Sequence, residues 1–270
     1  MTYHLDYDSL RADTVRQVAK LMAAAAITAP KSGGQLLLAG KHLFIETVIV
    51  DDRETLSSLA AWMRARGKER REAIWFRDAE AAEAIDAVLF VGLSDWYPPV
   101  YDCGACGYAT CAEFMQATSQ LRRDSQELEF VGPQCNLRDI DLGIAVGSAA
   151  KTAAIHSIDA RCQTRIAVAA RKLEVIHADI AVALSLSLTH KAVGSDRRMP
   201  DVDFDTLDLP PTGTLPTGVP GAAREGGARN RQQPSRSSRA TKETGTWAGL
   251  LLDEACARAP RTASESVAMS

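Results

Sequence analysis

Residues 102–111 read DCGACGYATC, and residues 132–135 read GPQC. Together these two segments carry four cysteines, Cys103, Cys106, Cys111 and Cys135. Three of the cysteines fall within nine positions, and the fourth follows 24 positions after the third. A tight loop with three thiolates and a remote fourth thiolate is typical of the ligands of a cubane iron–sulfur cluster. We therefore predict that the four cysteines bind such a cluster.

Two glycines and a predicted helix support this interpretation. Gly104 and Gly107 each follow a cysteine, where a residue without Cβ can adopt positive φ and bring its amide close to sulfur. The pattern of residues 108–122 predicts a helix with Cys111 in its first turn. The positive end of that helix dipole would then face an anionic cluster.

Zinc is the main alternative metal, because four thiolates also form a closed tetrahedral site. Zinc fingers usually contain two CxxC-type pairs, whereas Cys135 has no second cysteine nearby. A disulfide framework is less favoured, since the 270 residues contain six cysteines and the first ten lack the pattern of a signal peptide. We expect a reducing, cytoplasmic location, with Cys162 as a packed or free thiol and Cys256 as a thiol of the tail.

The cysteine segments also resemble a known family. DCGACGYATCAEF and GPQCNLRDIDLGIAVGSAAKTAAI, followed by VAARKL and ADIAVALSLSLTHK, resemble a prokaryotic family of uncharacterised proteins that contain a ferredoxin domain. The CGxCGxxxCxxF portion is also similar to the four-iron four-sulfur module of corrinoid iron–sulfur proteins and of a subunit of the Rnf electron-transport complex. The resemblance covers about residues 10–192, and it implies a [4Fe-4S] cluster on the four cysteines named above.

Composition favours one globular body followed by a tail. The net charge is −3 and 46% of the residues are hydrophobic, so a core is expected and a nucleic-acid partner is not. The longest apolar stretch, LMAAAAITAP, is far shorter than the ~18 residues of a spanning helix, so no membrane insertion is expected. We assign residues 1–195 to the globular body, which contains the iron–sulfur segment 93–138. Residues 196–270 are rich in Pro, Gly, Ser, Thr and Arg and are predicted to be a disordered tail.

Helical and strand patterns are interleaved along the body, which predicts an α/β or α+β fold. Helices are predicted from Asp8 or Ser9 to just before Pro30 and at residues 55–66, 79–85, 140–155 and 166–175. Strands are predicted at residues 35–39, 42–50, 87–92 and 180–188. The last strand alternates large apolar with small residues, so we expect it to be central in a sheet.

Three local interpretations concern helix ends and glycines. Gly67 is predicted to end the second helix. Asp139 and Asp141 are predicted to cap the helix that follows them. Gly143 and Gly147 are predicted to allow dense core packing, with a cofactor cradle as the alternative.

The order of elements outside the cysteine segment is similar to the flavin-binding nitroreductase fold. The similarity is carried by TAPKSGG after the first helix and by the late DLGIAVGSAAKTAA helix, although the usual arginine pair of that fold is missing. It implies a nitroreductase-like layered body, with the cysteine-rich segment inserted into it. It also implies that Lys31 and Ser32 bind the phosphate of FMN. The alternative is that Lys31 is a solvated loop residue.

Two main functions agree with these patterns. The first is a [4Fe-4S] electron-transfer protein with a redox partner protein that the sequence does not identify. The second is an oxidoreductase that uses flavin, with the cluster as an electron relay. A structural zinc or iron–sulfur site in an interaction protein is a third alternative. The sequence contains no clear acid, base or nucleophile constellation, so catalytic residues are not assigned.

Two segments are candidates for contacts with partner proteins. The basic run at residues 64–71 is either a solvated helix junction or a docking patch for an acidic redox partner. The segment 246–259, TWAGLLLDEACARA, is either a short docking helix or apolar content without a role. A homodimer is also among the assemblies that we consider.

Overall fold

The computed structural model describes residues 4, 6–33, 43–189, 193–195 and 198–216. Its α-helices are α1 (Tyr7–Thr28), α2 (Arg53–Arg70), α3 (Ala73–Ala84), α4 (Cys111–Asp124), α5 (Asn136–Ile155) and α6 (Arg165–Lys172). Its strands are β1 (Ile45–Val50), β2 (Ala87–Leu93), β3 (Asp159–Gln163) and β4 (Ile180–Ser187). Among the described residues no membrane-spanning helix is found, since each helix is too short or too polar for the core of a bilayer.

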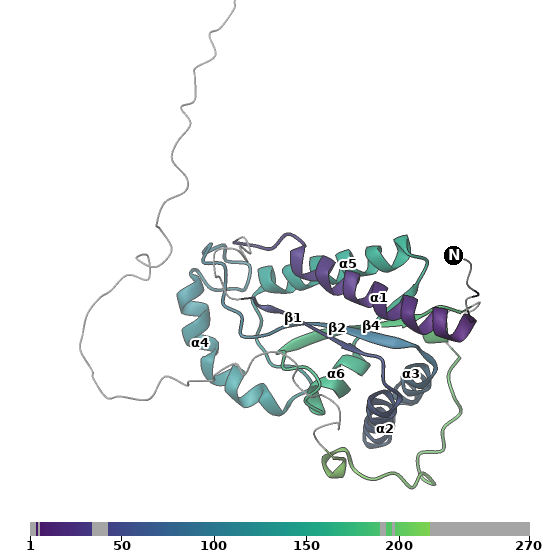
Figure 1. Ribbon diagram of the computed structural model, residues 1–270. Helices are drawn as coiled ribbons and strands as arrows, with labels where there is room; N and C mark the ends of the chain where they lie inside the picture. The colour runs from purple at the N-terminus through teal and green to yellow at the C-terminus, as the bar shows by residue number, and fades with distance from the viewer. Residues whose placement is uncertain (1–3, 5, 34–42, 190–192, 196–197, 217–270) are drawn as a thin grey trace, which may run out of the picture. The chain divides into compact units, whose positions relative to one another are not determined.

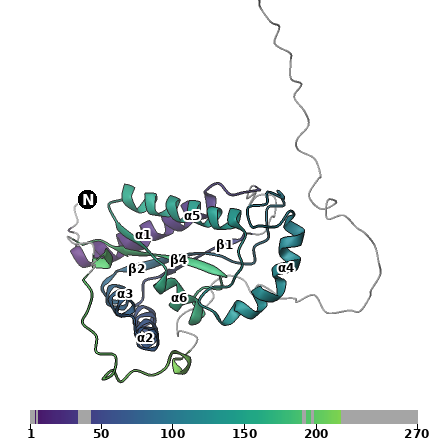
Figure 2. The ribbon, with the colours of Figure 1, turned by 180° about the vertical axis from the view of Figure 1, so that it is seen from behind.

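The four strands form one antiparallel sheet in the order β1-β2-β4-β3. The register of β1 and β2 runs from Ile45 opposite Leu93 to Val50 opposite Val88. Figure 1 shows α1 and α5 on one face of the sheet and α2, α3 and α6 on the other, and Figure 2 shows the same layers from behind. Every residue of β2 is buried, because helices cover both faces of this central strand. The body is therefore a layered α+β fold with the sheet in the middle.

Alternate residues of β2 belong to two separate cores. Leu89 and Val91 pack in the core that contains α1 and α5, whereas Val88 and Phe90 pack in the core that contains α2, α3 and α6. This alternation follows from the two-residue period of a strand.

The first predicted helix is confirmed as α1. The Asp6 side chain caps it by accepting a hydrogen bond from the Ser9 amide at 3.0 Å. The helix ends at Thr28, two residues before Pro30, which has no amide hydrogen to continue the ladder.

The predicted strands at 42–50, 87–92 and 180–188 correspond to β1, β2 and β4. The prediction that the last of these is central is confirmed, because β4 lies between β2 and β3. The strand predicted at 35–39 lies outside the described residues. Strand β3 was not predicted, because its sequence, DARCQ, has no apolar alternation and its pairing with β4 is long-range.

The prediction that Gly67 ends the second helix is wrong. Helix α2 continues to Arg70 and stops where Arg71 adopts a left-handed conformation with φ of 55°. A Cβ on Gly67 would lie 2.7 Å from Cε2 of Phe76 and 2.8 Å from Cβ of Trp75. The glycine therefore allows α3 to approach α2 closely.

The prediction for Gly143 and Gly147 is also wrong. Both residues are exposed on α5, and a Cβ at either position would meet no atom within 4 Å. The face of α5 that packs in the core carries Ala145, Ala149 and Ala153 instead.

The packed part of the chain extends past the boundary predicted at residue 195. The Lys68 ammonium donates to the carbonyls of Leu207 and Leu209, and Glu69 accepts from the amide and hydroxyl of Thr212, both at 2.8 Å. The Phe204 ring meets the edge of Phe76 with 5.9 Å between centroids. We call residues 198–216 the C-terminal segment, and it lies along α2 and α3. The remainder of the predicted tail, residues 217–270, lies outside the described residues.

Candidate metal centre

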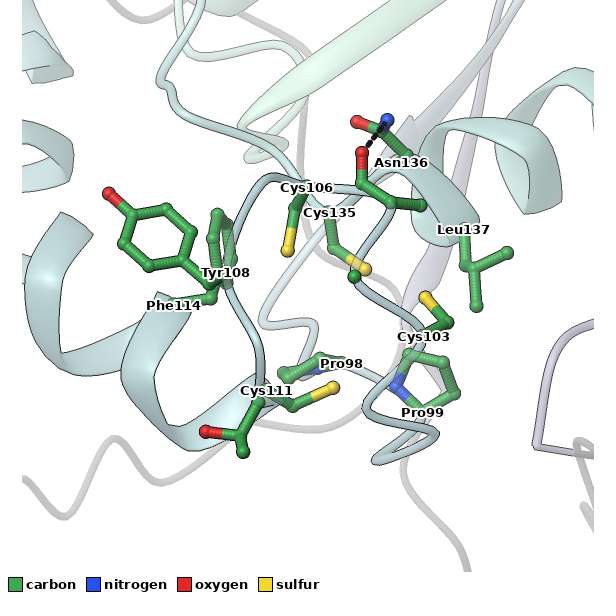
Figure 3. A pocket seen from close by; sticks show the side chains of 13 residues that line it. Pro98, Pro99, Cys103, Cys106, Tyr108, Cys111, Phe114, Cys135, Asn136 and Leu137 are labelled. Atoms are coloured by element: carbon green, nitrogen blue, oxygen red, sulfur yellow. Dashed lines mark hydrogen bonds between the residues drawn. The ribbon is translucent and has the colours of Figure 1, made fainter.

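The four predicted ligands surround a single hollow. Cys103 and Cys106 lie on the loop between β2 and α4, Cys111 is the first residue of α4, and Cys135 directly precedes α5. Figure 3 shows the four sulfur atoms directed toward a common space. The structure therefore brings the loop and the distant segment to one hollow, and the role of the four cysteines as metal ligands stays a prediction.

The sulfur atoms are spread around this hollow and do not meet at one point (Figure 3). Within the part of the chain that the structure describes, no group of three or more His, Cys, Asp and Glu residues is arranged to hold a metal ion. A cubane cluster binds each thiolate on a different iron. The donor set, four thiolates around one hollow, is therefore one that an iron–sulfur cluster accepts.

Positive φ angles shape the loop as the sequence predicts. Gly104 has φ of 72° and Gly107 has φ of 86°, and the Gly107 amide donates to the Gly104 carbonyl at 2.9 Å. This tight turn leaves Cys103 exposed and Cys106 half-buried. Asp102 also lies in the left-handed region, with φ of 49°.

A capping box fixes the start of α4. The Thr110 hydroxyl accepts from the Glu113 amide at 3.1 Å, and the Glu113 carboxylate accepts from the Thr110 amide at 3.2 Å. The amide of Cys111 donates to the Asp102 carboxylate at 2.7 Å. These bonds hold Cys111, which is buried, at the N-terminal end of the helix.

Cys135 occupies the N-cap position of α5. Its carbonyl accepts from the amides of Arg138 at 2.8 Å and Asp139 at 3.1 Å. Burial raises the pKa of the Cys135 thiol, and the nearby sulfurs of Cys106 and Cys111 raise it further, while the amides of the first helical turn lower it. Close thiolates repel one another, so positively charged irons would stabilise the deprotonated set.

One side-chain bond joins the two cysteine segments directly. The Asn136 amide nitrogen donates to the Ala105 carbonyl at 2.6 Å, which links α5 to the turn between the first two cysteines. This contact is visible in Figure 3 as a dashed line. Sequence reasoning missed Asn136, because an asparagine after a cysteine carries no signal for a contact 31 residues away.

Aromatic side chains form one wall of the hollow. Phe114 is 1% exposed and lines it together with Tyr108, whose ring centroid lies 5.7 Å away. Trp96 packs behind Phe114 with 6.5 Å between centroids. This apolar wall shields one side of the cysteine set from water.

Lys31 is buried, so it is not the solvated loop residue of the alternative interpretation. Its ammonium donates to the carbonyls of Ala26 at 2.8 Å and Ala29 at 2.5 Å. Burial lowers the pKa of Lys31 to about 8, although the charge of Asp141 opposes this change. The ammonium would have to leave these carbonyls to reach a phosphate, so the FMN contact stays a prediction.

Ser32 is held through its backbone. Its amide donates to the Asp141 carboxylate at 2.7 Å, and its carbonyl accepts from the Arg138 guanidinium at 2.9 Å. Its predicted contact with a flavin phosphate likewise stays a prediction.

The predicted capping role of Asp141 is wrong, because α5 begins earlier, at Asn136, and Asp141 lies inside it. Asp141 is 1% exposed and pairs with Arg138, which is 2% exposed, at 2.7 Å. Asp139 is in the first turn of the helix, and burial raises its pKa.

The ion pairs of the basic run at 64–71 favour its interpretation as a helix junction. Its arginines form ion pairs with acidic side chains of the same chain: Arg64 with Glu83, Arg66 with Glu69 and Glu129, Arg70 with Glu72 and Glu129, and Arg71 with Asp205. Cys162 lies on β3, whereas Cys256 and the segment 246–259 lie outside the described residues.

A relative from Archaeoglobus fulgidus, described as "Uncharacterized protein", is 37% identical to the chain over 193 residues. The alignment covers 72% of this chain and 97% of the relative. Residues 131–197 match the family "Uncharacterized protein containing a ferredoxin domain (DUF2148)", and residues 99–122 match "Putative Fe-S cluster". The chain belongs to this ferredoxin-domain family. The two matched ranges contain all four cysteines of the site, so an iron–sulfur redox role is indicated for it.

Solved structures with a similar arrangement are nitroreductase-like at low identity. B. megaterium NfrA1 is 11% identical with a TM-score of 0.38, covering 70% of this chain and 63% of that protein, which is less than two thirds of its length. Nitroreductase A from Vibrio parahaemolyticus is 12% identical with a TM-score of 0.35, covering 76% and 72%. A BluB-like flavoprotein from Clostridium difficile is 11% identical with a TM-score of 0.41, covering 75% and 88%. Similarity at this level says nothing of the cofactor or activity of this chain.

Proposed function

We propose that this protein is an electron-transfer protein that holds a [4Fe-4S] cluster on Cys103, Cys106, Cys111 and Cys135. The observation that carries the proposal is the convergence of two cysteine segments, 24 residues apart, on one hollow. Four thiolates are the full ligand set of a cubane cluster, one for each iron.

The residues of the chain would act on such a cluster in three ways. Cysteine sulfurs bind it, the N-terminal ends of α4 and α5 direct positive dipole ends toward its negative charge, and Phe114 excludes water from one side. When bound, a [4Fe-4S] cluster supplies one-electron redox chemistry at a potential that its hydrogen bonds and solvent exposure set.

Two features favour electron transfer over catalysis. The four thiolates leave no iron position free for a substrate. Cys103 is exposed, so an electron donor or acceptor can approach one corner of the site from solvent. Between Trp96 and Thr110 the only charged side chain is Asp102, which is bonded to the Cys111 amide. A redox partner would therefore meet a largely uncharged rim of loop residues.

Zinc remains the competing occupant, because four thiolates also complete a closed tetrahedral zinc site. Zinc fingers usually contain two CxxC-type pairs, whereas Cys135 has no second cysteine nearby in the sequence. Analysis for sulfide separates the two occupants, since a zinc site contains none.

Anaerobic purification of the full chain tests the proposal. We expect iron and acid-labile sulfide in equal amounts, close to four of each per chain, and a brown colour that dithionite bleaches reversibly. Cys106→Ala should lose the cluster, whereas Cys162→Ala should keep it, because Cys162 lies on β3 and is no part of the hollow. Zinc without sulfide, or iron retained at the wild-type level in Cys106→Ala, would contradict the proposal.

Analysis of the same anaerobic preparation for flavin also tests the second function, a flavin-dependent reductase with the cluster as an electron relay. Released FMN in a near-equal amount to protein, together with its loss in Lys31→Met, would favour that reductase. Cluster without flavin supports electron transfer alone.

A further inference from the structure

Helix α4 begins at Cys111 and α5 begins directly after Cys135. An arginine of α4 bonds the backbone of the segment before Cys135, and an arginine of α5 bonds the backbone of the chain that leads into the loop with Cys103 and Cys106. We infer that Arg122 of α4 and Arg138 of α5 are positioning residues, which hold the two cysteine segments together before any cluster enters. This inference rests on the proposed function, because it concerns the assembly of the same site.

Arg122 connects α4 to the segment that carries the fourth cysteine. Its Nη1 donates to the carbonyl of Pro133 at 2.7 Å, two residues before Cys135. Its Nη2 pairs with Asp179, and its guanidinium lies 4.4 Å from the centre of the Trp96 ring. Asp179 also accepts from the Trp96 indole at 2.9 Å. The arginine thus joins α4, the loop after β2 and the turn before α5.

Arg138 makes the reverse connection. It lies in the first turn of α5, and its Nε donates to the carbonyl of Tyr97 at 2.6 Å, at the entry to the cysteine loop. Its Nη1 bonds Asp141 at 2.7 Å and the Ser32 carbonyl at 2.9 Å. Its guanidinium also lies 4.0 Å from the centre of the Phe44 ring.

Both guanidiniums obtain their partners from the protein alone. A charge removed from water is costly unless hydrogen bonds and an opposite charge compensate it, and the side chain of Arg138 is 2% exposed whereas that of Arg122 is 16% exposed. Asp179 and Asp141 supply the opposite charge, and three backbone carbonyls, those of Pro133, Tyr97 and Ser32, supply the remaining acceptors. None of these acceptors is a cysteine sulfur. We expect the bonds to form in the apoprotein, in contrast to small metal domains that fold only with their metal.

Arginine is suited to this role because its planar fork reaches two acceptors at fixed angles. Arg122 bonds a carbonyl and a carboxylate with its two terminal nitrogens. A lysine could make one of these bonds but not both in the same geometry. Partners of metal ligands commonly change metal affinity ~10–100-fold when they are mutated.

The test compares Arg122→Met with Arg123→Met in the full chain. Arg123 is the next residue of α4, is exposed, and donates from its guanidinium to the side chain of Gln120. Hydrogen exchange of the apoproteins would be followed for residues 97–111 and 131–138. Because Arg122→Met removes hydrogen bonds that hold these segments together, we expect their exchange to be about fivefold to tenfold faster in Arg122→Met and unchanged in Arg123→Met.

A second measurement uses protein reconstituted with ferrous iron and sulfide. Release of iron to a chelator should be at least about tenfold faster in Arg122→Met, and Arg122→Lys should restore part of the loss. The electron paramagnetic resonance signal of the reduced protein should broaden or split in Arg122→Met, because the two segments no longer have one relative position. Arg138→Lys provides the same comparison from the other helix, and remains informative if Arg122→Met does not fold.

The two ideas can fail separately. If wild-type protein takes up no iron and sulfide, the proposed function fails, while the apoprotein exchange still decides the role of the arginines. If wild-type protein is loaded and Arg122→Met matches Arg123→Met in exchange, release and signal, the positioning role is wrong.

Discussion

The Asp102 carboxylate accepts a hydrogen bond from the amide of Cys111 at 2.7 Å. The residue directly before the first cysteine of the hollow is therefore bonded to the third cysteine, the first residue of α4, in addition to the capping box at that helix end. This bond joins two residues that are nine positions apart and so connects the two ends of the loop. A second bond within the loop runs from the Gly107 amide to the Gly104 carbonyl.

Replacement of Asp102 should loosen this loop. Asp102→Ala removes the acceptor of the Cys111 amide and places alanine at a positive φ, so we expect a loss of about 1–3 kcal/mol in the free energy of unfolding and faster release of iron. Asp102→Asn should be mild, because asparagine retains an acceptor and tolerates the left-handed region.

Asp95→Ala is the matched control for this change. Asp95 is exposed and has φ of 50°, so its replacement introduces the same backbone strain without removing the bond to Cys111. Chemical denaturation with each variant measures the difference. Equal losses in Asp102→Ala and Asp95→Ala would show that the carboxylate contributes nothing beyond backbone conformation.

Two helical glycines should respond to alanine with opposite signs. Gly143→Ala on the exposed face of α5 meets no atom within 4 Å, and we expect it to stabilise the protein by about 0.5–1 kcal/mol. Gly67→Ala places a methyl group 2.7 Å from Phe76 and should destabilise by about 1–3 kcal/mol. Thermal unfolding measures both. A stabilised Gly67→Ala would mean that α3 can move away from α2 without cost.

The C-terminal segment 198–216 should contribute to stability. A chain that ends at Ser195 loses the contacts of Lys68 and Glu69 with this segment and the contact of Phe204 with Phe76. We expect it to be about 2–4 kcal/mol less stable than a chain that ends at Pro216. Urea unfolding of the two truncated chains tests this expectation, and equal midpoints would show that the segment lies on α2 and α3 without stabilising them.

Lys31 should impose a specific pH dependence. Its pKa is lowered from the ordinary 10.5 to about 8, so between these values the unfolded chain binds more protons than the folded chain. Stability therefore rises with pH through this window, and below about pH 8 the full cost of burying the charge is present. The free energy of unfolding of the wild type minus that of Lys31→Met should increase between pH 8 and pH 10.5. A difference that stays constant would show that the carbonyls of Ala26 and Ala29 fully compensate the ammonium.

The turns of the cysteine loop could be predicted because their signal is local. Three cysteines within nine positions restrict the chemistry by themselves, and the glycines after Cys103 and Cys106 indicate the turn that the structure contains. The strands β2 and β4 could be predicted from their apolar composition, since a strand covered on both faces has few polar residues.

The contacts that organise the site could not be predicted. Arg122 and Arg138 bond backbone carbonyls, which every residue carries, so no residue type identifies their partners. Gly67 has the local signal of a helix end, but the packing of Phe76 overrides that signal. Strand β3 depends on pairing with a strand that follows it in the sequence, which no local pattern of five residues reveals.

The four cysteines differ in solvent exposure, and this difference has a consequence for the lifetime of the protein in air. Cys103 is exposed, Cys106 is half-buried, and Cys111 and Cys135 are buried. An oxidant that arrives from solvent should reach the Cys103 thiol first and the two buried thiols last. Loss of the site in air would then begin at a single residue while the other three cysteines are still reduced, and reduction of that residue alone would restore the full set.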